Sequence, residues 1–184
     1  MTIQESVITC LRKYAEFGGR AARAEYWWWI LATTLVSTAL SAIDSFVSAI
    51  SGLYVYSPLS TIFGLAVLLP GLAVTARRLH DIGRSGWWQL LWVIIGIIGI
   101  VPLVVGIVVG VVAAFSGGGS WESLAKPAFW IPVAAGLLVT FLIWIGLFIW
   151  WLVWMVKQGQ PGANHHGPDP RAWDVDGGES VTPA

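Results

Sequence analysis

Charged side chains are scarce in this sequence of 184 residues, because Asp, Glu, Lys and Arg together make up only 11% of it. A soluble globular domain carries about 25% of such residues, so the composition excludes an ordinary water-soluble protein. Ten basic residues balance ten acidic residues and the formal net charge is zero. The total charge therefore indicates no nucleic-acid partner.

Cysteine is also nearly absent. A single residue, Cys10, excludes an internal disulfide and a thiolate metal site. The chain lacks a serine-nucleophile elbow, a phosphate-binding glycine loop and an HExxH motif. We expect no catalytic residues, no metal and no cofactor, and we do not expect an enzyme.

An enzyme acting at the membrane surface is the alternative that histidine chemistry leaves open. His80–Asp81 and His165–His166–Asp169 supply groups of the kind that act as general bases or metal ligands. Adjacent side chains point apart on a helix or strand, so such a site requires assembly across segments.

Apolar residues dominate the chain at 57%, and thirteen of them are tryptophans. A helix crosses the hydrocarbon layer of a bilayer with about 20 residues. The sequence predicts an all-α membrane protein whose domain at 27–156 contains four transmembrane helices. The expected spans are roughly 27–48, 58–76, 87–114 and 131–155.

Few residues interrupt these runs. Asp44 is the one acid in the first span, and we expect it at a solvated boundary of the membrane. Pro70 is expected to kink the second span, and Pro102 to interrupt the long third run. Gly106 and Gly110 have the spacing that allows close helix packing.

The segment 1–26 is predicted to be a cytoplasmic amphipathic helix followed by a basic loop. Thr2 and Glu5 have the spacing of a capping box. Ile3, Val7, Cys10, Leu11 and Tyr14 recur at helical spacing on one face. This helix either lies in the membrane interface or packs on the rest of the protein.

The segment 157–184 is predicted to be a short, turn-rich cytoplasmic tail. Its beginning, GQPGANHHGPDP, is dense in turn formers. We expect disorder beyond about residue 171, where aromatic residues become rare and acids accumulate.

Positive charge is distributed unevenly about the spans. The N-terminal segment has four Lys or Arg residues, the 77–86 loop three and the tail two, against Lys126 alone in the other two loops. Nine against one predicts that both termini are cytoplasmic. Membrane-interface anchors are expected in the paired tryptophans at the predicted cytoplasmic ends, namely Trp27, Trp28, Trp87, Trp88, Trp150 and Trp151.

The stretch RRLHDIGRSGWW at 77–88 gathers three arginines, a histidine and an aspartate between two apolar runs. Arg77 and Asp81 share a face if the second helix continues, and two glycines bracket Arg84. Two interpretations stay open. The cluster is either a structural ion-pair network with Glu25, or a site for a phosphate or lipid headgroup.

With FGGRAARAEYWW at 17–28 and PGANHHGPDP at 161–170, this stretch resembles the bacterial inner-membrane family called domain of unknown function 805. The resemblance implies a small multi-span inner-membrane protein without an established activity. We expect the three blocks to converge in a cytoplasmic cap. Its candidate ligand-binding residues are Arg20, Arg23, Glu25, Arg77, Arg78, His80, Asp81, Arg84, Asn164 and Asp169, with Phe17 beside them.

A binding or structural role fits these features best, with an anionic phospholipid headgroup or a partner protein as the ligand. The alternative is a small transporter or channel, formed by a homo-oligomer if one chain encloses no pore. Transport paths usually contain ionisable residues, and Asp44 is the only candidate.

Overall fold

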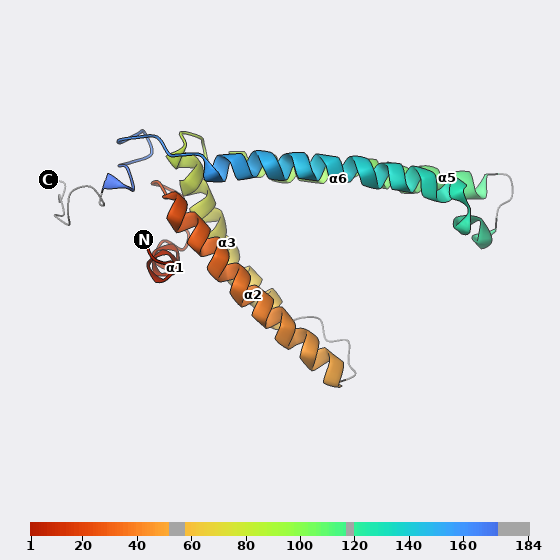
Figure 1. Cartoon of the computed structure of the whole chain (residues 1–184), viewed down its shortest axis with the longest axis horizontal. Helices are drawn as coiled ribbons and strands as arrows, with labels where there is room; N and C mark the ends of the chain where they lie inside the picture. Colours follow the sequence, from red (N-terminus) through yellow and green to blue (C-terminus); the bar gives the residue numbers. More distant parts are fainter. Residues whose placement is uncertain (52–57, 117–119, 173–184) are drawn as a thin grey trace. The chain divides into compact units, whose positions relative to one another are not determined.

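The computed structural model describes residues 1–51, 58–116 and 120–172. Within them the chain is helical, with no strand beyond an isolated bridge in the tail. The elements in order are α1 (Ile3–Arg12), α2 (Arg23–Ser51), α3 (Pro58–Asp81), α4 (Trp88–Ile98), α5 (Val101–Phe115), a short 3₁₀ helix η1 (Trp121–Ala125) and α6 (Pro127–Val156) (Figure 1). The predicted disorder of the tail concerns residues that lie mostly outside the described part.

Four helical segments of the described chain are long and apolar enough to cross a membrane. They are Arg23–Ser51, Pro58–Asp81, Trp88–Phe115 and Pro127–Val156. The prediction of four long apolar helices is confirmed. Three of them extend past the predicted spans, chiefly at the ends that carry the arginines or at Pro127.

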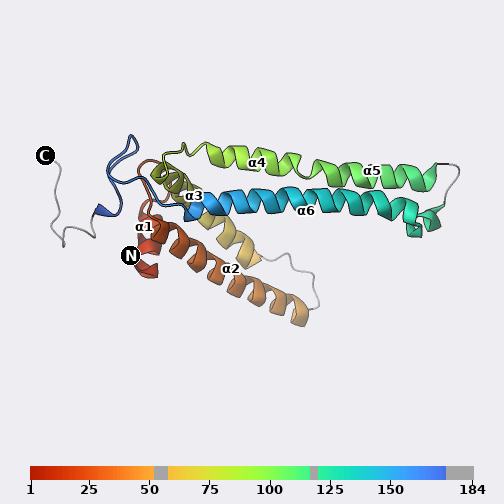
Figure 2. The same ribbon diagram turned by 45° about the horizontal axis from the view of Figure 1, so that its top comes forward.

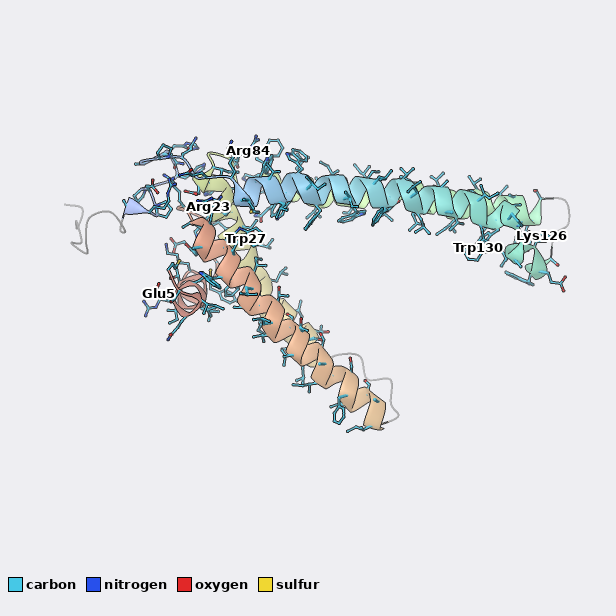
Figure 3. All side chains as sticks on the ribbon, viewed as in Figure 1. Glu5, Arg23, Trp27, Arg84, Lys126 and Trp130 are labelled. Carbon is cyan, nitrogen blue, oxygen red and sulfur yellow. The ribbon has the colours of Figure 1, made fainter. Side chains whose placement is uncertain are left out.

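The chain forms two compact units, Met1–Trp88 with the segment from Met155 onward, and Gln89–Trp154. In the first unit α2 and α3 lie side by side, with α1 packed against them (Figures 1 and 2). Figure 3 labels Glu5 on α1, and Arg23 and Trp27 at the start of α2.

The helix α1 begins with the predicted capping box and packs through small side chains. Ser6 and Cys10 are buried, and the Ser6 hydroxyl donates to the Glu25 carbonyl at 2.6 Å. Ile3 and Leu11 are exposed. Only part of the predicted apolar face therefore packs against the protein. The close approach of α1 to α2 leaves room only for small side chains at the contact.

Asp44 lies near the end of α2, where it meets the start of α3. Its carboxylate accepts hydrogen bonds from the backbone N–H groups of Leu59 and Ser60, at 3.3 and 2.9 Å, and from the Ser60 hydroxyl. The side chain is buried. Our expectation of a solvated residue is wrong, because the unpaired N–H groups of a helix start attract this carboxylate.

Pro70 is buried within α3 and has no N–H to donate to the carbonyl of Ala66, four residues earlier. The Tyr14 hydroxyl donates to that carbonyl instead, at 2.5 Å. A residue after α1 thus satisfies an acceptor that proline leaves open in an apolar helix.

Replacing Tyr14 with phenylalanine is expected to lower the free energy of unfolding by about 1 to 3 kcal/mol, because the Ala66 carbonyl loses its donor. Denaturant unfolding in detergent measures the loss. The matched control is Tyr14→Phe combined with Pro70→Ala, which restores an N–H in α3 and should recover part of the stability. Equal losses with and without Pro70→Ala would contradict this explanation.

In the second unit α4 and α5 run along α6 (Figure 2). The interruption expected at Pro102 occurs three residues earlier, since α4 ends at Ile98 and α5 begins at Val101. Pro102 falls in the first turn of α5, where a missing N–H costs no intrahelical bond. Trp92 of α4 packs against Trp150, Trp151 and Trp154 of α6.

Glycines allow α5 and α6 to approach closely. A Cβ added to Gly106 would overlap the carbonyl oxygen of Pro132, and one added to Gly136 would overlap that of Pro102. At Gly110 the added atom would lie 2.6 Å from a carbonyl oxygen of α6. The small-residue spacing read from Gly106 and Gly110 marks a real helix contact.

Candidate functional site

The best-defined polar site of the first unit is the arginine–carboxylate cluster, formed by Arg20, Arg78 and Asp81. Arg20 donates to Oδ1 of Asp81 from Nε at 3.0 Å and from Nη2 at 2.8 Å. Arg78 donates from Nη1 to Oδ2 of the same carboxylate at 2.5 Å. All three residues are buried, with 6%, 0% and 2% of their surfaces exposed. One carboxylate therefore holds two guanidinium groups away from water.

A second buried pair joins α2 to α3. Nη2 of Arg77 lies 3.0 Å from Oε1 of Glu25, and its Nη1 donates to the carbonyl of Glu16 at 2.7 Å. Arg77 and Asp81, which helical spacing places on one face, do not pair, because Asp81 binds Arg20 and Arg78. The structural network with Glu25, one of our two interpretations, is present.

Cys10 of α1 lies beside this pair, with Sγ 3.9 Å from Oε1 of Glu25. Burial, reinforced by the negative charge of Glu25, raises the pKa of the Cys10 thiol to about 12. The residue stays a protonated, buried thiol at neutral pH, as expected of a small apolar residue.

The tail folds against the arginine–carboxylate cluster and is held there mainly by backbone carbonyls. Arg20 donates to the carbonyls of Gln160 and Gly162, each at 2.5 Å. Arg78 donates to the carbonyl of Lys157 and, at 3.2 Å, to that of Met155. The Gln160 N–H donates to the Asp81 carbonyl at 2.8 Å. The sequence does not single out these tail residues, because every residue carries a backbone carbonyl that can accept a hydrogen bond.

Farther along the tail, Asn164 and Asp169 stabilise its turns. The Asn164 side chain donates to the His80 carbonyl at 3.1 Å. Asp169 accepts from Arg171 and from the Gly162 N–H. The hydrogen bonds from Arg171 lower the pKa of the Asp169 carboxyl to about 2. Both predicted residues belong to the cap, and each is half-buried and hydrogen-bonded within the chain.

His80 of α3 and His166 of the tail stack face to face, with ring centroids 3.8 Å apart and planes 3° from parallel. His80 Nδ1 lies 3.1 Å from the Gly19 carbonyl oxygen. Among residues 1–51, 58–116 and 120–172, no group of three His, Cys, Asp or Glu side chains has the arrangement of a metal site. The contact is therefore one of aromatic rings.

The remaining predicted residues lie at the rim of the cap. Arg23 is exposed and donates to the Val156 carbonyl at 3.3 Å, and Phe17 is exposed. The guanidinium carbon of Arg84 lies 5.2 Å from the centre of the Trp88 ring, at the turn labelled in Figure 3. The structure thus brings together residues of all three sequence blocks, but the shared centre is filled by the protein's own carboxylates and carbonyls.

The predicted anchors differ in their surroundings. Three of them are exposed, namely Trp27, Trp28 and Trp87, and their role as membrane anchors stays a prediction. Trp150 is exposed as well, but Trp151 is half-buried in the aromatic contacts around Trp92.

A family model described as "Protein of unknown function (DUF805)" matches residues 14–123 of the chain. The chain belongs to the DUF805 family. Two of the three blocks, 17–28 and 77–88, lie inside the matched range. The matched range also contains every residue of the arginine–carboxylate cluster and of the Arg77–Glu25 pair.

Three curated proteins of Escherichia coli K12 are similar to this chain. Inner membrane protein YhaH of Escherichia coli K12 is 41% identical over 88 residues, covering 46% of this chain and 69% of its own length. Inner membrane protein YhaI of the same strain is 42% identical over 85 residues, covering 46% and 68%. Uncharacterized protein YiiR is 30% identical over 176 residues, covering 92% and 90%. No solved structure matches.

These relatives and the four long apolar helices agree on the setting of the protein. YhaH and YhaI are inner membrane proteins by name, and this chain's own helices fit a bilayer by length and composition.

Proposed function

We propose that this DUF805 protein is a non-enzymatic inner-membrane protein whose arginine-rich cap binds an anionic lipid surface on the cytoplasmic side. The main observation behind this proposal is that some cations of the first unit are buried and paired within the protein, whereas others are exposed. Arg20, Arg77 and Arg78 are buried on protein acceptors. Exposed or half-buried cations surround them, namely Arg12, Lys13, Arg23, Arg84 and Lys157.

The buried arginines hold the cap together, and lipid contact falls to the outer cations. Phosphate recognition by a guanidinium requires donors that reach the ligand. The guanidinium N–H groups of Arg20 and Arg78 already donate to Asp81 and to carbonyls of the tail. An outer ring of cations near an anionic leaflet gains about 1 kcal/mol per residue from the surface potential.

Charge placement supports the cytoplasmic orientation, since nine of the ten Lys and Arg residues lie on the side of the termini. The surface of α1 supports an interfacial position for this helix. Three apolar side chains of α1 are exposed, namely Ile3, Ile8 and Leu11. Two basic residues follow them, Arg12 as the last residue of α1 and Lys13 as its C-cap residue. Apolar side chains beside basic ones suit the boundary between headgroups and acyl chains.

Anionic lipid binding tests the proposal. Replacing Arg12, Lys13 and Lys157 together with glutamine is expected to weaken retention of phosphatidylglycerol in nanodiscs by about 100-fold, from about 1 kcal/mol for each cation. Added salt should reduce binding by the wild type more than by the variant.

The matched control is Lys126→Gln, which removes an exposed cation from the second unit. It is expected to keep the wild-type retention. Equal retention by the triple variant and the wild type would sink the lipid proposal, and an equal loss in the control would reduce it to a nonspecific charge effect.

Transport gains no support from its one candidate residue. Both carboxylate oxygens of Asp44 accept hydrogen bonds from residues at the start of α3. A site for a moving ion or proton needs a group that exchanges partners, and here the carboxylate is committed to holding a helix end.

A further inference from the structure

The stacked rings of His80 and His166 connect two parts of the first unit that are distant in sequence. His80 occupies the last turn of α3, and His166 belongs to a turn closed by mutual hydrogen bonds between the backbones of Asn164 and Gly167, each at 3.0 Å. The ring contact accompanies the bond from the Asn164 side chain to the His80 carbonyl. The tail is therefore fixed to α3 by one aromatic contact and one polar contact at this point.

The charges facing this stack are mostly positive or can become so. Arg20 and His165 both act on His166, and the rings of His165 and His166 lie 3.8 Å apart. The nearest acid of the cluster, Asp81, is occupied by Arg20 and Arg78. Nε2 of His166 is buried and has no hydrogen-bond partner among the described residues. A proton placed there would find no acceptor.

We propose that the C-terminal segment 159–172 docks on α3 through an acid-sensitive contact, which releases the segment when the His80–His166 pair takes up a proton. Two parallel imidazole rings at van der Waals distance stack well when neutral. A positive charge on either ring meets Arg20 or the partner ring without a nearby free carboxylate. This inference does not rest on the lipid role proposed above.

The direction of the pH dependence follows from His166. Burial lowers the pKa of the His166 imidazole, and the neighbouring His80, His165 and Arg20 lower it further. The released segment, with an ordinary pKa of about 6.5, binds more protons than the docked one. Docking is thus fully stable above about pH 6.5 and is lost as the pH falls below it, by at most about tenfold in the docking constant per pH unit.

Another ion pair of the tail does not titrate in this range. The pKa of Asp169 is about 2, because Arg171 donates to its carboxylate. The turn that Asp169 stabilises keeps its charges at pH 5, so loss of that pair does not explain a release at pH 5 to 6.

Release would also change the cluster. Arg20 would lose the carbonyls of Gln160 and Gly162, which both belong to the released segment. Acid thereby converts a closed arginine–carboxylate cluster into one that water and anions reach.

The experiment uses the full chain in nanodiscs with a nitroxide label at Ala163→Cys, an exposed position beside Asn164. Cys10 is buried with a thiol pKa of about 12, so it stays unlabelled at pH 7; the unsubstituted chain checks this. We expect a restricted spectrum at pH 7.5 and a mobile fraction that grows by up to about 30-fold at pH 5.

Two phenylalanine variants separate the stack from other effects of acid. In His166→Phe a ring still stacks on His80, but the buried nitrogen that takes up the proton is gone, so this variant is expected to stay restricted at pH 5. His80→Phe keeps His166 beside Arg20 and His165, so it is expected to keep an acid response that is smaller than that of the wild type. The control His165→Gln removes the exposed neighbour and should keep most of the wild-type response. An unchanged wild-type spectrum at pH 5, a wild-type response in His166→Phe, or a mobile label in both phenylalanine variants at pH 7.5 would overturn the proposal.

Discussion

Replacing Asp81 with asparagine is expected to lower the free energy of unfolding by about 3 to 5 kcal/mol, because it leaves two buried guanidinium groups without a counter-charge. Arg20 and Arg78 both donate to this carboxylate and are almost fully removed from water. Asparagine keeps the shape of the side chain and some of its hydrogen bonds, so the loss reports mainly the missing charge. Thermal unfolding of the purified protein in detergent measures it.

Asp169→Asn is the matched control for Asp81→Asn. Asp169 also pairs with an arginine, Arg171, but 32% of that arginine side chain is exposed. Solvent screens this pair, so its loss should cost about 1 kcal/mol or less. Similar losses at Asp81 and Asp169 would contradict a special role for the buried cluster.

Replacing Gly106 with leucine is expected to cost about 3 kcal/mol or more, because the new side chain would meet the backbone of α6 at Pro132. The carbonyl there belongs to the helix and cannot rotate away, so α5 and α6 must separate. The loss of contact along this helix pair is measured by denaturant unfolding and by increased proteolysis within 89–154.

Gly146→Leu gives the corresponding control within α6. A Cβ at Gly146 would meet nothing within 4 Å, and the residue is exposed. Leucine there should leave stability unchanged or raise it slightly, since glycine disfavours a helix by up to about 1 kcal/mol. A loss at Gly146 equal to that at Gly106 would show that leucine is harmful in these helices wherever it is placed.

The helices themselves were predictable, because hydrocarbon imposes a length and an apolar composition that the sequence displays directly. The sequence predicts the break in the third run at Pro102, whereas α4 ends at Ile98 and α5 begins at Val101. Proline is tolerated in a first turn, so it marks the beginning of α5 and the break precedes it.

Residues of all three sequence blocks meet in the structure, as the sequence predicts, and their binding of a ligand stays a prediction. The pairings among these residues were less predictable. Helical spacing puts Arg77 and Asp81 on one face of α3, yet Arg77 pairs with Glu25, and Asp81 pairs with Arg20, 61 positions away. Such ion pairs depend on the distances between different segments, and the spacing of residues within one helix does not predict those distances.

Contacts to the backbone were outside the reach of the sequence altogether. Tyr14 serves the carbonyl that Pro70 leaves open, and Arg20 and Arg78 hold the tail through its carbonyls. Every residue has a backbone carbonyl oxygen, so the residue type does not indicate which of these oxygens accepts a side-chain hydrogen bond. Gly159 is the one signal in retrospect, because a Cβ there would collide with the Asp81 carboxylate.

The sequence by itself determined that this chain consists of long apolar helices, that its charges collect in three short blocks, and that it belongs with a bacterial inner-membrane family. Those properties follow from local composition, because the preference of each residue for water or hydrocarbon depends on its own side chain. Only the tertiary structure decided that the central arginines are paired with Asp81, Glu25 and the tail and removed from water. That outcome depends on which segments approach within hydrogen-bonding distance, a property of packing that composition does not encode.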